Sequence, residues 1–113
     1  METLSTMKCE ACKAGAPHVT HEEVIEYSEQ TPGWQITKDD DINKLTKTYF
    51  FKNWKEAMAF ANRVGELAEE QGHHPAVLVE WGKVGVTWWT HKIKGLHKND
   101  FIMAAKCEEL AKQ

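Results

Sequence analysis

The sequence predicts a single α+β domain in which helices pack on one face of a four-stranded antiparallel sheet, in the order α-β-β-α-β-β-α. Three observations predict this fold. Apolar residues recur at helical spacing in the middle of the chain, strand-like segments come in two pairs, and a short turn joins the members of each pair. With 113 residues the chain can bury one compact core but not two.

The N-terminal part of the chain divides into an arm and the start of the domain. Residues 1–18 show no apolar period and are expected to form an irregular arm, so that the single α+β domain occupies residues 19–113. A first helix is expected over residues 20–29, because Thr20 and Glu23 form a capping-box pattern ahead of apolar positions.

A first pair of strands follows this helix. Thr31-Pro32-Gly33 ends the helix, since proline cannot continue it, and residues 34–37 then alternate as a strand does. The acidic run Asp39-Asp40-Asp41 is typical of a hairpin turn. Residues 42–51 are rich in β-branched and aromatic types, which favours a second, antiparallel strand.

The main helix is the most regular element of the pattern. Asn53 is a typical N-cap, Glu56 occupies the third helical position, and Gly72 ends the helix. Its apolar positions recur at helical spacing and are expected to cover the sheet: Trp54, Ala57, Met58, Ala61, Val64, Leu67 and Ala68.

The second pair of strands is expected over residues 76–81 and 84–91, joined by a tight turn at Gly82-Lys83. Residues 92–98 are then expected to form a loop. A closing helix fits residues 99–112, where apolar side chains again recur at helical spacing.

Charge and hydropathy exclude two classes of partner. A net charge of −3 and a pI near 6.1 provide no basic face for direct nucleic-acid binding. No apolar run approaches the ~20 residues that span a bilayer, and the first residues lack a secretory pattern. The sequence therefore predicts a cytoplasmic protein without a membrane segment, in which the three cysteines are reduced thiols.

His73-His74-Pro75 is the first candidate for chemistry. Imidazole gives or takes a proton near neutral pH, and Pro75 favours extended backbone in the residue before it. These residues are equally consistent with a polar loop between helix and strand. Glu69 lies four residues before His73, where it could orient an imidazole or be an ordinary exposed helix residue.

His91 is the second candidate. If it ends a strand, the alternation places its side chain on the face of Thr87 and Trp89, opposite Val84 and Val86. It could be a simple edge residue. It could equally form one wall of a pocket for a flat aromatic ring.

These residues together resemble a known family. The series Glu69-x3-His73-His74-Pro75-x5-Trp81-x9-His91-x8-Asp100 is similar to the signature of the pterin-4a-carbinolamine dehydratases. The similarity runs from about residue 20 to the C-terminus and also includes Gly33-Trp34, Phe51-Lys52-Asn53-Trp54 and Gly95-Leu96. Outside the signature, Cys9-Glu10-Ala11-Cys12 resembles the start of some bacterial members.

The resemblance implies a dehydration reaction. A 4a-hydroxytetrahydropterin, formed when an aromatic amino acid hydroxylase uses its pterin, would lose water to give the quinonoid dihydropterin, with no metal and no cofactor. His73, His74 and His91 correspond to the three site histidines of the family. We expect His73 and His91 to handle the protons and His74 to position the pterin, because an ordinary imidazole pKa of ~6.5 leaves both protonation states available.

Four further residues are expected to contact or orient the substrate: Glu69, Pro75, Trp34 and Asp100. Trp34 corresponds to a family tryptophan that could stack on the pterin, although a core tryptophan is an equal interpretation. Asp100 lies in the first turn of the last helix, where capping competes with a site role. Trp81 is expected to pack rather than to take part in catalysis.

Two alternative hypotheses are of other classes. Cys9-x2-Cys12 with His18 and His21 contains four potential zinc ligands, although the short, irregular surroundings disfavour a metal site. The resemblance also implies assembly into homodimers or homotetramers, a hydroxylase as a possible partner, and a possible role as a dimerising interaction module, since animal relatives bind a transcription factor.

Overall fold

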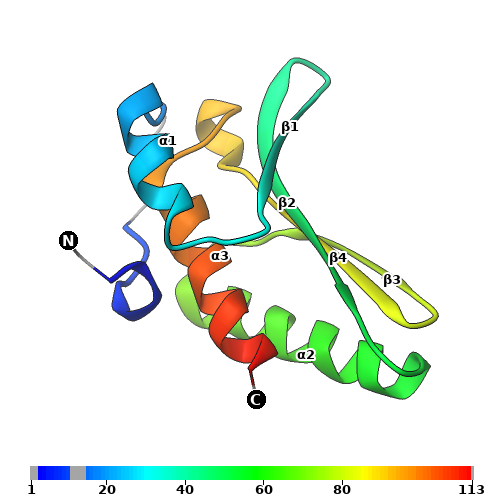
Figure 1. Ribbon diagram of the computed structural model, residues 1–113. Helices are drawn as coiled ribbons and strands as arrows, with labels where there is room; N and C mark the ends of the chain where they lie inside the picture. Colours follow the sequence, from blue (N-terminus) through cyan, green and yellow to red (C-terminus); the bar gives the residue numbers. More distant parts are fainter. Residues whose placement is uncertain (1–2, 11–14, 113) are drawn as a thin grey trace.

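The computed structural model describes residues 3–10 and 15–112 and confirms the predicted α+β fold and its element order (Figure 1). Two single-turn 3₁₀ helices accompany the main elements. In chain order the elements are η1 (Leu4–Thr6), α1 (His21–Ser28), β1 (Gln35–Asp39), β2 (Ile42–Phe50), α2 (Trp54–Gln71), β3 (Ala76–Glu80), β4 (Lys83–Trp88), η2 (His91–Ile93) and α3 (Lys98–Ala111).

The four strands form one sheet in the order β1-β2-β4-β3, and all three pairings are antiparallel. Asp40 and Asp41 make the first hairpin turn with φ angles of 54° and 65°, a left-handed conformation that aspartate tolerates. The second turn consists of Trp81 and Gly82, one residue earlier than predicted, because Lys83 already pairs with Glu80. In the strand order β1-β2-β4-β3, the two edge strands are β1 and β3.

Helices α2 and α3 cover one face of the sheet, as predicted, and α1 packs on α3 through the rings of Tyr27 and Phe101 (Figure 1). The inward side chains of β4 are buried at every second position, which confirms the predicted alternation. The core between the layers contains Leu45, Tyr49, Val84, Val86 and Trp88 from the sheet, and Ala57, Phe60, Val64, Phe101 and Ile102 from the helices.

The predicted end of the last strand is wrong. Strand β4 stops at Trp88, and His91 begins η2 instead of ending the strand. The reason is a local bridge: the N–H of Thr90 donates to the carbonyl of Gly95 at 2.8 Å, so the chain closes on itself after β4. Helix α3 starts at Lys98, one residue before the predicted start, because His97 caps it.

The N-terminal segment packs on the domain. Leu4 in η1 is buried against α3, and its N–H donates to Gln30 Oε1 at 2.7 Å. Cys12, one of the potential zinc ligands, lies outside the described residues. Among residues 3–10 and 15–112, no helix has the length and apolar character needed to cross a bilayer.

Candidate active site

The C-terminal end of α2 determines where the first histidine lies. Gly72 has a φ of 66°, the left-handed conformation in which a residue without a Cβ carries no steric cost. The N–H of Gly72 donates to the carbonyl of Glu69, and the N–H of His73 donates to the carbonyl of Ala68. This pair of hydrogen bonds is a Schellman motif, which ends the helix and turns His73 toward the core.

His73 is held on two sides. Its ring lies parallel to the indole of Trp88, with an interplanar angle of 8°, and its Nε2 lies 2.7 Å from Asp100 Oδ1. Only 5% of His73 is exposed. A carboxylate can only accept hydrogen bonds, so Nε2 carries the proton and Nδ1 is the nitrogen that can accept one.

Asp100 connects the histidine to the start of α3. Its fully buried carboxylate also accepts a hydrogen bond from the Thr90 hydroxyl at 2.8 Å and one from the His97 N–H at 2.9 Å. The His97 bond is half of a capping box. The carboxylate therefore caps α3, as one interpretation predicted, and it binds the His73 ring but is fully buried and does not line the cavity. Nothing in the pattern of the sequence pointed to Thr90.

His74 and Glu69 form an exposed pair beside the buried one. His74 Nε2 donates to Glu69 Oε1 at 2.6 Å, although the two side chains are 59% and 80% exposed. Exposed pairs of this kind contribute little to stability. Pro75 follows directly and leads into β3, so the structure places it between His74 and the sheet rather than on the lining of the cavity.

His91 lies across from the other two histidines, on η2. Its ring centroid is 4.6 Å from that of Trp89, so the two side chains share a side even though the strand has ended. The Nζ of Lys44 lies 4.1 Å from the centroid of the same indole. Trp89 therefore contacts both a cation and the imidazole of His91.

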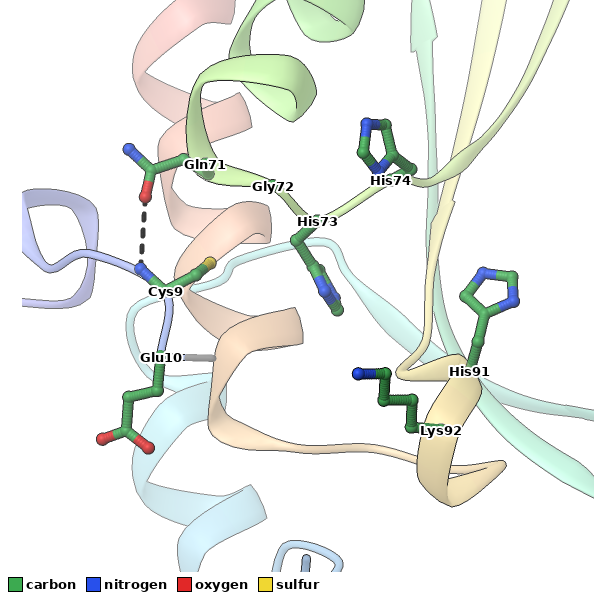
Figure 2. A pocket seen from close by; sticks show the side chains of 8 residues that line it. All are labelled: Cys9, Glu10, Gln71, Gly72, His73, His74, His91 and Lys92. Atoms are coloured by element: carbon green, nitrogen blue, oxygen red, sulfur yellow. Dashed lines mark hydrogen bonds between the residues drawn. The ribbon is translucent and has the colours of Figure 1, made fainter. Parts of the chain in front are cut away.

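The three histidines line one cavity of about 490 Å³, a size typical of small-molecule sites (Figure 2). The sequence predicted this meeting of His73, His74 and His91. The other lining residues were not predicted as site residues: Cys9, Glu10, Gln71, Gly72 and Lys92. Cys9 and Glu10 enter from the N-terminal segment, on the side of the cavity away from His91 and Lys92 (Figure 2).

The structure does not bring Trp34 to this cavity. Trp34 is buried in the core against Tyr49, and its Nε1 donates to Glu108 Oε2 at 3.3 Å. This is the alternative interpretation of a core tryptophan at the start of a strand. Trp81, which was expected to pack, is instead 70% exposed because it lies in the hairpin turn.

Metal-ligating side chains are not grouped in the part of the chain that the structure describes. Within residues 3–10 and 15–112, no three His, Cys, Asp or Glu side chains are placed to hold one ion. His18 instead binds the backbone carbonyl of Ile93 through its Nε2 at 2.8 Å. The imidazole and carboxylate side chains that the structure places together can accept and donate protons.

A sequence model of the family described as pterin 4 alpha carbinolamine dehydratase matches residues 17–110, which include all three histidines and Asp100. The chain belongs to this family. A Nitrosococcus oceani protein provisionally named as a pterin-4-alpha-carbinolamine dehydratase is 56% identical over 112 residues, or 99% of each chain.

Two solved structures are similar to this chain. A Brucella melitensis crystal structure described as a transcriptional coactivator/pterin dehydratase has a TM-score of 0.74 and 30% identity, covering 84% of this chain and 99% of that one. A pterin dehydratase-like protein described as a RuBisCO assembly factor in the alpha-carboxysome has a TM-score of 0.61, covering 73% of this chain and 93% of its own. At 23% identity, this similarity is one of fold alone.

Proposed function

We propose that this protein dehydrates a 4a-hydroxytetrahydropterin to the quinonoid dihydropterin and water. The observation that supports the proposal most strongly is the cavity lined by three imidazoles, one of which is fixed by a buried carboxylate. The family membership supplies the substrate class, and the relative that is 56% identical bears the same activity in its name. The reaction needs one group that accepts a proton and one that donates a proton.

His73 is the proposed base. It takes the proton from N5 of the pterin, and the electron pair of the N–H bond forms the C4a=N5 double bond. The imidazolium that results lies 2.7 Å from the Asp100 carboxylate, which stabilises its positive charge in a buried setting. Asp100 is thus a positioning residue that acts through His73.

His91 is the proposed acid. It donates a proton to the 4a-hydroxyl as the C4a–O bond breaks, so that the group leaves as neutral water. Its exposed position on η2 lets it recover a proton from solvent. His74, held by Glu69, positions the ring. The base takes one proton and the acid gives one proton, so the proposed step balances without a metal ion or a redox cofactor.

The reaction recycles the pterin of an aromatic amino acid hydroxylase, which makes such an enzyme the proposed source of the substrate. We also propose that the chain works as a homodimer or homotetramer. Edge strand β3 leaves Leu78 64% exposed, and Phe50 and Trp81 are 74% and 70% exposed nearby on β2 and the β3–β4 turn. Exposed apolar side chains beside an open strand edge favour pairing with another chain.

The same surface supports a second candidate function, as a dimerising interaction module for a hydroxylase or a transcription factor. The Brucella melitensis protein is described both as a transcriptional coactivator and as a pterin dehydratase. The two functions are compatible, because the exposed apolar residues and the histidine cavity are formed by different residues.

Variants of the histidines separate the two functions. His73→Ala and His91→Ala should each lower the dehydration rate by about 10²-fold or more. Light scattering should show that both variants keep the oligomer mass of the wild-type protein. His21→Ala, on the exposed start of α1, is the matched control and should keep full activity. Unchanged turnover in both site variants would refute the proposed roles, and loss of activity only together with loss of assembly would favour the interaction module.

A further inference from the structure

We propose that residues 9 and 10, here called the N-terminal wall, close one side of this cavity, and that the Cys9 side chain contacts the substrate and limits the size of the pterin the cavity admits. The inference rests on the proposed function. The wall lies outside the residues matched by the family model, which begin at residue 17. In Figure 2 it faces His91 and Lys92 across the cavity, with His73 above the space between them.

A buried side chain of α3 anchors the N-terminal wall by hydrogen bonds. Asn99 is fully buried, and its amide makes both hydrogen bonds that the backbone of Glu10 can make. The N–H of Glu10 donates to Asn99 Oδ1 at 2.9 Å, and Asn99 Nδ2 donates to the Glu10 carbonyl at 2.8 Å. A buried amide used in this way fixes the position of the chain that it binds.

A residue of α2 anchors the N-terminal wall by a further hydrogen bond. The N–H of Cys9 donates to Gln71 Oε1 at 3.1 Å. Asn99 precedes Asp100, which orients His73, and Gln71 precedes Gly72, which turns His73 into the core. The wall and the His73 imidazole are therefore positioned by the same two helix ends, so the space between them is defined.

The wall presents the side chain of Cys9 to a ligand, and its Sγ also lies 3.9 Å from the Asn99 carbonyl. The N–H groups of both residues and the carbonyl of Glu10 are already hydrogen-bonded. In Figure 2 the Cys9 thiol points to the cavity side and the Glu10 carboxylate points away from the histidines. A small thiol leaves room for a flat ring with a substituent, whereas a larger side chain at this position would occupy that room.

Kinetics of three variants test the wall. Cys9→Leu and Gln71→Ala should each raise KM for 4a-hydroxytetrahydrobiopterin by about 5-fold or more while kcat stays within about 2-fold, because they change fit rather than proton transfer. The effect of Cys9→Leu should be smaller for a pterin with only a 6-methyl group. Gln30→Ala, which removes a similar glutamine–backbone bond at Leu4, away from the cavity, is the matched control and should leave KM unchanged.

Thiol labelling tests the N-terminal wall without measuring turnover and without introducing a larger side chain at residue 9. In a Cys12→Ser background, Cys9 is the accessible thiol, because burial raises the pKa of Cys107 to about 12 and keeps it unreactive. Saturating 7,8-dihydrobiopterin should slow alkylation of Cys9 by about 5-fold or more when the wall contacts the ligand.

The outcomes separate this inference from the proposed function. If the wild-type protein turns over the carbinolamine but dihydrobiopterin leaves the alkylation rate of Cys9 unchanged, the inference about the wall is wrong and the proposed function stands. If the wild-type protein neither turns over nor binds a pterin, the proposed function fails instead. Slowed alkylation together with the raised KM of Gln71→Ala supports the wall.

Discussion

Replacing Asp100 by asparagine keeps the shape of a fully buried side chain and removes its charge. The carboxylate now accepts hydrogen bonds from His73, Thr90 and the His97 N–H. The amide has one oxygen, which best serves the Thr90 and His97 donors, since both reach the same atom, Oδ2. Its NH₂ group then faces His73 and must donate to Nε2.

This exchange changes both activity and stability. An NH₂ donor at Nε2 moves the imidazole proton to Nδ1, so the nitrogen proposed as the base is blocked, and kcat should fall by about 10²–10⁴-fold. Hydrogen bonds to a charged group contribute about 1.5–3 kcal/mol, and part of that contribution is lost, so Asp100→Asn should lower the free energy of unfolding by about 1–3 kcal/mol.

Thr90→Val is the matched control. It removes one donor to the same carboxylate, at a site that is 2% exposed, but leaves the His73 hydrogen bond in place. Urea unfolding should show a loss of about 1 kcal/mol, and dehydration kinetics should show kcat within about 10-fold of wild type. A folded Asp100→Asn protein with wild-type kcat would refute the reasoning, because Asp100 would then serve only as a helix cap.

Three further predictions follow from the structure. Glu108→Ala should lower the free energy of unfolding by about 3 kcal/mol in urea, because it leaves the donors of Tyr49, Trp34 and Lys47 without their acceptor; a stability equal to wild type would contradict this. Gly72→Ala should lower the free energy of unfolding by about 1–2 kcal/mol through backbone strain alone, since an added Cβ meets nothing within 4 Å, and kcat should stay near that of wild type because the turn keeps its shape; a stability equal to wild type would contradict this. A hydrogen bond from the Thr20 N–H lowers the pKa of Glu23 below its ordinary value of 4.5, so the ionised Glu23 stabilises the fold fully above the unfolded-state pKa, and this stabilisation is lost as pH falls through the lowered native pKa. Glu23→Gln should therefore remove this contribution to the pH dependence of the free energy of unfolding between about pH 6 and about pH 3. A pH dependence equal to that of wild type would contradict the assignment.

Local patterns were sufficient to predict most of the fold. The Thr20 capping box, the Asn53 cap and Gly72 at the end of α2 all act within a few residues, and each is found where the sequence indicated it. The alternation of Val84 and Val86 likewise predicted which face of β4 is buried. These features depend on near neighbours, which a sequence displays directly.

The parts that the sequence did not predict depend on distant contacts. His91 was expected on a strand, but the Thr90–Gly95 bridge ended β4 early, and the His91 side chain still contacts Trp89 as predicted. Glu10 reaches the cavity through Asn99, a residue 89 positions away. A long-range contact of this kind produces no local period or spacing in the sequence. Residues that reach the cavity in this way can be identified only when the three-dimensional positions of the helix ends are known.

The position of Trp34 shows that a role known for a family residue cannot be assigned to this chain from residue type alone. A tryptophan at the start of a strand can stack on a ligand or fill a core, and both uses place the same residue at the same position. In this chain the indole Nε1 donates to Glu108, on the part of α3 remote from the histidines. The neighbouring lysine and tyrosine bind the same carboxylate, which explains why the tryptophan is held in the core.

The proposal that the histidine cavity dehydrates a pterin carbinolamine is tested most directly by one measurement. Freshly generated 4a-hydroxytetrahydropterin is mixed with catalytic amounts of the wild-type protein, and the appearance of quinonoid dihydropterin is followed against buffer alone. We predict a rate that rises in proportion to protein concentration and falls by about 10²-fold or more in His73→Ala. A rate equal to that in buffer at every protein concentration would contradict the proposed function.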